Sequence, residues 1–252
     1  MSNKISEKVA LITGANKGIG FETARQLGKL GLVVVMGSRD EAKGRAAADK
    51  LRSEGIESVE AVRLDVTRPE DHKEVAKYLE GRHGRLDVLV NNAGIQLEEL
   101  DFRNSFNTTS TGTLEILRRT FETNFFSTVA LTRGLLPLIR KAPAGRIVNL
   151  SSILGSLSLH ADPSSGIYAK KVFAYDASKT ALNAFTIHLA QELRDTKIKV
   201  NSAHPGWVQT EMGGSGAPMD LAEGAKTSVQ LATLPDDGPT GGYFHLGKPL
   251  PW

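Results

Sequence analysis

Short runs of apolar residues alternate along this chain with longer stretches in which apolar residues recur at helical spacing. Short apolar runs without polar alternation are typical of parallel strands that are buried on both faces. The pattern therefore predicts a doubly wound α/β fold. Strands are expected at residues 9–13, 32–36, 59–64, 88–90, 146–150 and 199–203, and helices at 18–30, 40–54, 69–82, 114–140 and 173–194.

No internal repeat, low-complexity linker or domain boundary divides the sequence, so residues 1–252 are expected to form one domain. Three segments interrupt the alternation where the chain leaves a strand, at 96–113, 153–172 and 206–218. Long loops in a compact domain are usually functional or disordered, and ligands of open α/β sheets bind beyond the carboxyl ends of the strands. We therefore expect these three loops to shape a substrate pocket.

The turn between the first predicted strand and helix reads Thr-Gly-Ala-Asn-Lys-Gly-Ile-Gly, with glycines at positions 14, 18 and 20. Its spacing differs from the Gly-x-Gly-x-x-Gly dinucleotide fingerprint. The physical requirements are the same: a tight turn, a close backbone approach and a helix N-terminus directed at a pyrophosphate. For this segment alone, an ordinary glycine-rich turn is the alternative interpretation.

Two cations indicate which dinucleotide this turn would hold. Arg39 follows the second predicted strand, where NAD enzymes usually carry a carboxylate for the ribose 2′-hydroxyl, and Lys17 lies within the glycine turn. Arginine binds a phosphate bidentately and lysine binds it as a point charge. Asp40 is the counter-argument, although it is better interpreted as a helix N-cap. The sequence therefore favours NADP(H) over NAD(H).

Tyr175 and Lys179 stand four residues apart on the predicted helix 173–194. This spacing places a phenol and an ammonium on one helix face. A free tyrosine titrates near a pKa of about 10, and a nearby cation favours the phenolate. We therefore expect Lys179 to lower the pKa of Tyr175 toward the range of an acid–base catalyst.

Composition narrows the function classes. The formal net charge is +3 with no block of basic residues, so nucleic-acid binding has little support. The chain has no cysteine, and its six histidines are scattered, so no metal site is expected. The first eight residues do not resemble a secretory leader, and no apolar run is long enough to span a bilayer. We expect a cytoplasmic protein that does not bind membranes.

These motifs occur in an order that resembles the short-chain dehydrogenase/reductase family, and the glycine turn is similar to that of its carbonyl-reductase branch. The resemblance runs nearly end to end and implies a Rossmann fold with a parallel sheet of about seven strands. It rests on the glycine turn and on Asp65, Asn91-Asn92-Ala93-Gly94, Asn124, Ser151-Ser152, Tyr175, Lys179, Pro205-Gly206 and Thr210.

The resemblance implies roles for four catalytic residues. Tyr175 would donate a proton to the substrate oxygen, and Lys179 would bind the nicotinamide ribose and lower the tyrosine pKa. Ser152 would stabilise the developing charge on the substrate oxygen, and Asn124 would hold a water that links Lys179 to solvent. Each residue also has a plainer interpretation: Ser151 or Ser152 could simply end a strand, and Asn124 could cap or kink a helix.

The resemblance also implies a set of cofactor contacts. Asp65 would meet the adenine, although an Asx turn is its alternative role. Pro205, Gly206 and Thr210 would contact the nicotinamide end. The full expected cofactor set is Gly14, Asn16, Lys17, Gly18, Ile19, Gly20, Arg39, Asp65, Val66, Asn91, Asn92, Ala93, Gly94, Tyr175, Lys179, Pro205, Gly206, Val208 and Thr210.

Taken together, the sequence predicts an NADP(H)-dependent oxidoreductase that interconverts a ketone or aldehyde and an alcohol, with reduction as the favoured direction. The alternatives are an NAD-dependent secondary-alcohol dehydrogenase, in which Ser38 or Asp40 serves the ribose, and a non-catalytic NADP(H)-binding regulator.

Homo-oligomers could form through helices 114–140 and 173–194. His204 is expected to be a packed residue. Candidate pocket residues are Phe125, Leu154, Leu157, Trp207 and Met212.

Overall fold

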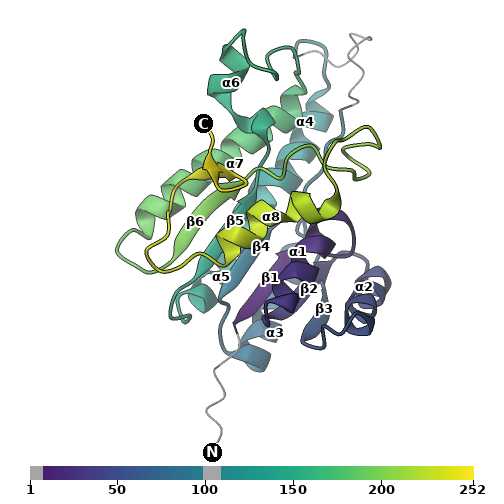
Figure 1. The fold of residues 1–252 in the computed structure, drawn as a ribbon, viewed down its shortest axis with the longest axis vertical. Coiled ribbons are helices and arrows are strands. Elements are labelled where there is room, and N and C mark those ends of the chain that lie inside the picture. Colours follow the sequence, from purple (N-terminus) through teal and green to yellow (C-terminus); the bar gives the residue numbers. More distant parts are fainter. Residues whose placement is uncertain (1–7, 99–108) are drawn as a thin grey trace, which may run out of the picture.

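The computed structural model describes residues 8–98 and 109–252. Its centre is one sheet in the order β3-β2-β1-β4-β5-β6-β7-β8, seen in Figure 1. Strands β1 to β7 pair in parallel, and β8 adds an antiparallel edge. The strands are β1 (Val9–Thr13), β2 (Val33–Ser38), β3 (Val59–Arg63), β4 (Val88–Asn91), β5 (Arg146–Leu150), β6 (Lys199–Ala203), β7 (Tyr243–His245) and β8 (Lys248–Pro249).

The doubly wound fold with about seven parallel strands is therefore confirmed. Six of these strands were predicted individually, and β7 and β8 were missed because each is too short to leave a periodic pattern. The direction in which the strand order grows reverses between β1 and β4. Open α/β sheets bind their ligands at such a switch point, beyond the carboxyl ends of the strands.

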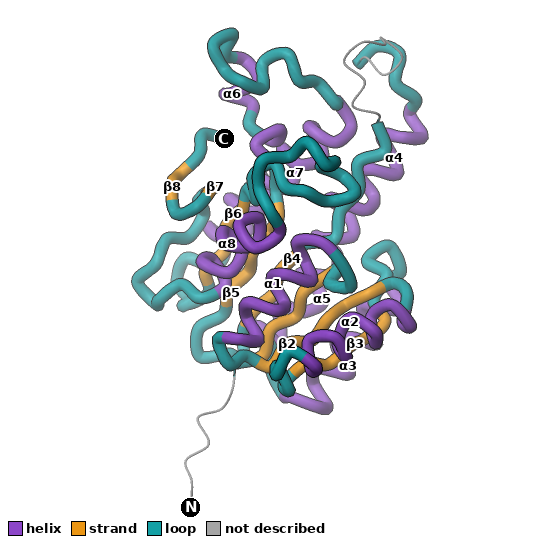
Figure 2. Tube along the Cα trace, turned by 45° about the vertical axis from the view of Figure 1, so that its right-hand side comes forward, coloured by secondary structure: helices purple, strands orange, loops and turns teal. Residues whose placement is uncertain are grey.

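Helices cover both faces of the sheet (Figure 2). Ile12 of β1 packs in the core cluster that contains Leu27 of α1, whereas its neighbour Leu11 packs in the cluster that contains Leu135 of α5 and Leu189 of α7. Alternate residues of the strand thus point to opposite faces of the sheet and pack in two separate hydrophobic cores. The helices are α1 (Gly18–Lys29), α2 (Glu41–Ser53), α3 (Pro69–His83), α4 (Leu114–Phe121), α5 (Ser127–Ile139), α6 (Leu157–Ala161), α7 (Phe173–Glu192) and α8 (Leu221–Ala232).

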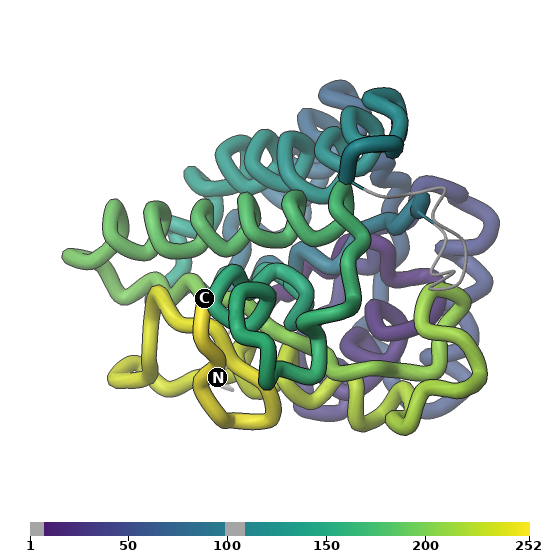
Figure 3. Tube along the Cα trace, turned by 90° about the horizontal axis from the view of Figure 1, so that it is seen from above, coloured from purple at the N-terminus to yellow at the C-terminus, as the bar shows by residue number. Residues whose placement is uncertain are grey.

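The helix predicted at 114–140 is interrupted. A turn of π-helix, η2 (Glu122–Phe126), separates α4 from α5, and Asn124 lies inside it. Such π-turns occur frequently at functional sites. In Figure 3, seen from above, α7 in green runs beside the teal helix formed by these three elements.

The three loops expected to shape a pocket are only partly regular. Segment 153–172 contains a short 3₁₀ turn, η3 (Ile153–Gly155), and α6, which lies at the top of Figure 1. Segment 206–218 is anchored by a bridge between Val208 and Met219. Most of segment 96–113 lies outside the described residues. Among the helices that are described, none is long and apolar enough to cross a membrane.

Candidate active site

The glycine turn after β1 is fastened to the turn after β4, across the switch point. The Asn92 side-chain amide donates to the carbonyl oxygens of Thr13 (2.7 Å) and Gly14 (3.2 Å). The Thr13 hydroxyl accepts from the backbone N–H groups of Asn92 (3.0 Å) and Ala93 (2.9 Å). A β-carbon on Gly20 would lie 2.4 Å from Asn92 Nδ2 and 2.5 Å from the Gly14 oxygen, so only glycine fits there.

Helix α1 begins in this turn with its backbone donors free of side-chain caps. Lys17 is the N-cap residue, its side chain makes no capping hydrogen bond, and the first turn carries no acidic residue. Asn16 and Ile19 are half-buried beside it. Because the first N–H groups of a helix have no intrahelical partner, this end suits an anion such as a pyrophosphate.

The groups that could select the ribose substituent lie beyond β2. Arg39 is exposed and forms no ion pair within the described part of the chain, whereas Lys17 pairs with Glu211 of the 206–218 loop. The Asp40 carboxylate caps α2 by accepting the Lys43 N–H at 3.0 Å, and this hydrogen bond lowers the Asp40 pKa. The N-cap interpretation of Asp40 is therefore confirmed.

Ser38, the other residue that could serve an NAD ribose, is buried at the end of β2. Its hydroxyl donates to the Asp40 carbonyl oxygen at 2.8 Å. Both polar groups of the NAD alternative are thus engaged within the protein. Of the two cations, Lys17 is engaged as well, by Glu211, and Arg39 is not ion-paired within the described residues.

Asp65 stands after β3 and closes an Asx turn. Its Oδ1 accepts from the Thr67 N–H (3.0 Å) and hydroxyl (2.8 Å), which is the alternative role that its position offered. The neighbouring Val66 is buried. An adenine contact by Asp65 stays a prediction.

Asn91 was expected to line the cofactor, and the structure places it elsewhere. Its amide donates to the Thr132 hydroxyl (3.0 Å) and to the Asn149 side-chain oxygen (2.8 Å), and all three groups are buried. The side chain therefore lies in the protein interior. Asn92 instead contacts the glycine turn through its side-chain amide, and Ala93 and Gly94 come next in the chain.

Asn124 holds the chain at Ile95, just after the turn that follows β4. Its Oδ1 accepts from the Ile95 N–H and its Nδ2 donates to the Ile95 carbonyl oxygen, each at 2.8 Å, and Nδ2 also donates to the Ser178 hydroxyl at 3.0 Å. The π-turn thus brings the asparagine against α7, one turn after Tyr175. No direct hydrogen bond joins Asn124 to Lys179, so a water between them stays a prediction.

Tyr175 and Lys179 share one face of α7, as their spacing predicted. The Lys179 ammonium lies 5.5 Å from the centre of the Tyr175 ring and donates to the Leu150 carbonyl oxygen at 2.7 Å, where β5 ends. A β-carbon on Gly94 would lie 3.4 Å from both Lys179 Nζ and Asn124 Oδ1. Gly94 therefore sits between the two groups.

Burial dominates the ionisation of this pair. It raises the pKa of Tyr175 to about 12, although a hydrogen bond from Ser152 acts in the opposite direction. Burial also lowers the pKa of Lys179 to about 8. The pKa of Tyr175 is therefore raised rather than lowered, because burial disfavours the phenolate. A lowering of this pKa by Lys179 stays a prediction.

The register of the serine pair is resolved by the same contacts. Ser152 interacts with the Tyr175 phenol and accepts from the Leu154 N–H at 3.2 Å, whereas Ser151 is buried on the side of Tyr243. Ser152 is thus the serine that faces the tyrosine.

His204, at the end of β6, is packed as expected, and it also connects two loops. Its Nδ1 accepts from the backbone N–H of Ile153 (3.1 Å) and of Gly206 (3.4 Å). Burial, assisted by His245, lowers its pKa to about 3. The imidazole is therefore neutral, and it fixes the start of loop 153–172 against the start of loop 206–218.

Loop 206–218 lies over the glycine turn. A β-carbon on Gly18 would lie 3.8 Å from Thr210, and Glu211 reaches Lys17. The backbone of Gly206 has a φ of 91°, and a β-carbon there would lie 2.1 Å from the Met219 sulfur. Contact of Pro205, Gly206, Val208 and Thr210 with a cofactor stays a prediction.

The candidate pocket residues lie at the surface rather than in a core. Leu157, Trp207 and Met212 are exposed, and Phe125 and Leu154 are half-buried. The Lys170 ammonium lies 5.5 Å from the centre of the Trp207 ring, so loops 153–172 and 206–218 meet there. That these side chains line the approach to Tyr175 stays a prediction.

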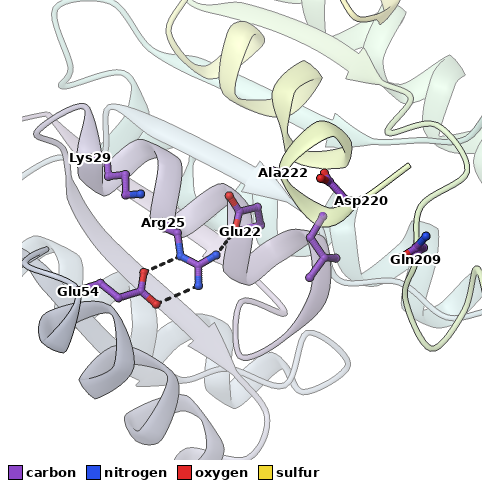
Figure 4. Close-up of a pocket in the computed structure, with 8 residues that line it drawn as sticks. Glu22, Arg25, Lys29, Glu54, Gln209, Asp220 and Ala222 are labelled. Carbon is purple, nitrogen blue, oxygen red and sulfur yellow. Dashed lines mark hydrogen bonds and ion pairs between the residues drawn. The ribbon is translucent and has the colours of Figure 1, made fainter. Parts of the chain in front are cut away.

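A hollow of about 610 Å³ lies between α1 and the start of α8 and is also lined by Gln209 of loop 206–218 (Figure 4). Of the two cations that line it, Arg25 and Lys29, Arg25 is held by Glu22 and Glu54. Within residues 8–98 and 109–252, no group of three side chains could hold a metal ion.

Glu98 orders the site although no sequence motif marks it. Its carboxylate accepts hydrogen bonds from the backbone N–H groups of Ala174 and Tyr175, each at 2.9 Å. No local signal could have revealed this contact, because the partners are 76 and 77 residues away in the sequence.

The fold and the arrangement of this site are those of doubly wound dinucleotide-binding enzymes. A family model described as short chain dehydrogenase matches residues 8–220. Carbonyl reductase (NADPH) 1 of Mus musculus is 36% identical over an alignment of 285 positions, which covers 98% of this chain and 99% of the relative. The chain belongs to the short-chain dehydrogenase family and is an oxidoreductase of that family.

Solved structures agree with this assignment. Salutaridine reductase from Papaver somniferum superposes with a TM-score of 0.82 at 30% identity, covering 95% of this chain and all of the other. A single-site variant of actinorhodin polyketide ketoreductase, solved with NADPH, gives a TM-score of 0.80 at 29% identity and covers 95% of each chain.

Proposed function

We propose that this protein is an NADP(H)-dependent oxidoreductase of the carbonyl-reductase type, in which Tyr175 exchanges a proton with the substrate oxygen. One observation carries the proposal. Ser152, Tyr175 and Lys179 converge at the carboxyl end of β5, next to a glycine turn whose helix N-terminus is uncapped. A proton donor thus lies where a nicotinamide bound along that turn would reach.

The ionisation of the site supports reduction. With a pKa of about 12, Tyr175 is protonated at neutral pH and is a proton donor toward a carbonyl oxygen. Ser152 stabilises charge that develops on the same oxygen. When bound, the nicotinamide supplies the hydride. Lys179, anchored to the Leu150 carbonyl, would orient the ribose hydroxyls and favour return of the proton to the phenol.

The choice of NADP(H) rests on Lys17 and Arg39. Both are cationic and are proposed to meet a ribose 2′-phosphate, with Lys17 exchanging its contact with Glu211 for the phosphate. Ser38 and Asp40, the polar groups of the NAD alternative, are engaged in the protein. The relatives are consistent with this choice, since one is named as an NADPH enzyme and another was solved with NADPH. The remaining residues of the cofactor set, apart from the Asn91 side chain, are also proposed to contact the dinucleotide.

Three further expectations stay predictions: one domain over residues 1–252, a cytoplasmic location, and a homo-oligomer formed through the segments 114–140 and 173–194. Substrates are proposed to be ketones or aldehydes that contact the exposed apolar side chains Leu157, Trp207 and Met212.

Replacement of the tyrosine tests the mechanism. Tyr175→Phe should leave NADPH binding intact and lower NADPH-dependent carbonyl reduction on the order of 10²–10⁴-fold. Tyr78→Phe is the matched control, because it removes from α3 a phenol that donates to Glu60 of β3 and takes no part in the proposed site. Wild-type turnover in Tyr175→Phe would exclude the mechanism.

Cofactor choice is tested by fluorescence titration with NADPH and NADH. Arg39→Ala should weaken NADPH binding on the order of tenfold and leave NADH binding unchanged, because a hydrogen bond to a charged group is lost. Arg45→Ala, which removes a nearby cation paired with Glu41, should change neither. Tighter binding of NADH than NADPH by wild type would favour the NAD-dependent dehydrogenase, and binding without turnover would favour the regulator.

A further inference from the structure

The catalytic helix α7 begins without a cap of its own. Val172 is the N-cap residue, and its apolar side chain cannot accept a hydrogen bond. A helix N-terminus exposes N–H groups that a Ser, Thr, Asp or Asn at this position normally satisfies. Here Glu98 satisfies two of them from a distant segment, because its two carboxylate oxygens accept from the Ala174 and Tyr175 N–H groups at 2.9 Å each.

This cap brings two buried carboxylates close together, which is unfavourable. Stabilisation of the helix therefore does not by itself explain it. Glu98 is only 9% exposed, and Asp176, in the same helix turn, is 8% exposed. Asp176 accepts the Val172 N–H at 3.0 Å, and its pKa is raised to about 7 by burial and by the negative charge of Glu98. Two buried carboxylates repel each other, so a serine at position 172 would cap α7 more cheaply.

The segment that carries Glu98 also contacts Asn124, the other proposed catalytic residue that packs against α7. Ile95 makes paired backbone hydrogen bonds with the Asn124 amide, and Asn124 in turn reaches Ser178 of α7. Residues 95–98 therefore touch α7 twice, directly at Tyr175 and through Asn124 one turn later. The same segment follows Asn92, Ala93 and Gly94, which are expected to line the cofactor.

We propose that Glu98 is a positioning residue for the proposed reaction: its carboxylate fixes the first turn of α7 and thereby sets the Tyr175 phenol against Ser152. The inference rests on the proposed function. Tyr175 is the third residue of the helix, so it moves when the first turn frays. Lys179 is held separately by the Leu150 carbonyl, one turn further along. Loss of Glu98 therefore misaligns the proton donor and leaves the cofactor groups in place.

Kinetics of Glu98→Gln and Glu98→Asp test the proposal. The glutamine is isosteric, but its NH₂ group faces an N–H, so one donor loses its acceptor. We expect kcat to fall on the order of 10- to 100-fold, as a displacement of about 1 Å produces, with KM and the NADPH Kd unchanged. Glu98→Asp keeps the charge and one hydrogen bond, and should recover part of the rate.

The matched control is Asp220→Ala, which removes the capping box of α8. It should lower thermal stability as the Glu98 variants do and leave kcat unchanged. A kcat of Glu98→Gln equal to wild type, or a fall in kcat matched by Asp220→Ala at equal loss of stability, would overturn the positioning role.

A second readout does not depend on turnover. The chain has four tyrosines, so ¹³Cζ-tyrosine NMR gives few signals, and Tyr175→Phe assigns the relevant one. Glu98→Gln should shift the Tyr175 signal, whereas Asp220→Ala should not; an unmoved signal would refute the proposal. If wild type shows no carbonyl reduction, the proposed function fails, and this signal still decides whether Glu98 positions Tyr175.

Discussion

Replacement of Gly20 by alanine should damage the cofactor turn and the stability of the protein together. The new β-carbon would lie 2.5 Å from the Gly14 carbonyl oxygen, a backbone atom that no rotamer change can move away. It would also lie 2.4 Å from Asn92 Nδ2, the atom that donates to the Thr13 and Gly14 carbonyls. The substitution therefore forces apart the two turns that meet at the switch point.

The magnitude follows from two effects. Inserting a methyl group into a packed site costs about 1–3 kcal/mol, and loss of the Asn92 hydrogen bonding adds about 1 kcal/mol. The sum is roughly 2–4 kcal/mol, and a chain of this size loses about 2–4 °C of Tm per kcal/mol. We expect Gly20→Ala to lower Tm by about 4–16 °C, and to weaken NADPH binding because the turn no longer closes.

The assay is thermal unfolding combined with NADPH titration, and Gly134→Ala is the matched control. Gly134 lies inside α5, and no atom lies within 4 Å of a β-carbon placed there. An alanine at that position should stabilise the protein by about 0.5–1 kcal/mol through helix propensity. If Gly20→Ala matches wild type in both stability and NADPH affinity, the close packing of the two turns is not as described.

Two further predictions concern charge. Since the His204 pKa is about 3 in the folded protein and about 6.5 when unfolded, only the unfolded chain binds a proton there between these pH values. Its contribution to stability is thus complete above pH 6.5 and falls by about 1.4 kcal/mol per unit as pH decreases toward 3. His204→Asn should make urea-derived unfolding free energies less dependent on pH in this window, and an unchanged slope, or the same change in the exposed His188→Asn, would contradict it. Glu211→Gln should tighten NADPH binding by no more than about fivefold, because an exposed carboxylate then no longer competes for Lys17; equal tightening of NADH would show that the effect does not involve the 2′-phosphate.

The fold was largely predictable because its signals are local. Continuous apolar runs gave six of the strands, and Asp40 marked the start of α2. The missed elements lack such signals. Strand β7 has three residues, and β8 has two. The π-turn at η2 is a single turn within a stretch that is otherwise α-helical, so the sequence pattern indicated one helix.

The chemistry of the site was predictable only where it follows from the separation of residues along the sequence. The helical separation of Tyr175 and Lys179 placed them on one face, and Ser152 was correctly chosen over Ser151 to face the tyrosine. The direction of the tyrosine pKa was not predictable in this way. It depends on how far the phenol is removed from water, which is a property of the packed structure rather than of the separation along a helix.

The contacts that order the site share a physical pattern that sequence reading cannot see. Backbone N–H groups at the start of α7 and of the loop after β5 are satisfied by side chains from distant segments, Glu98 and His204. A local cap would satisfy the same donors, but it would hold each element only to itself. A distant acceptor satisfies the donor and at the same time fixes the distance between two elements. In this way the first turn of α7 is tied to residues 95–98, which follow β4. The start of loop 153–172, next to Ser152, is tied to the start of loop 206–218. The alignment of proton donor, serine and cofactor path therefore depends on hydrogen bonds that no local motif encodes.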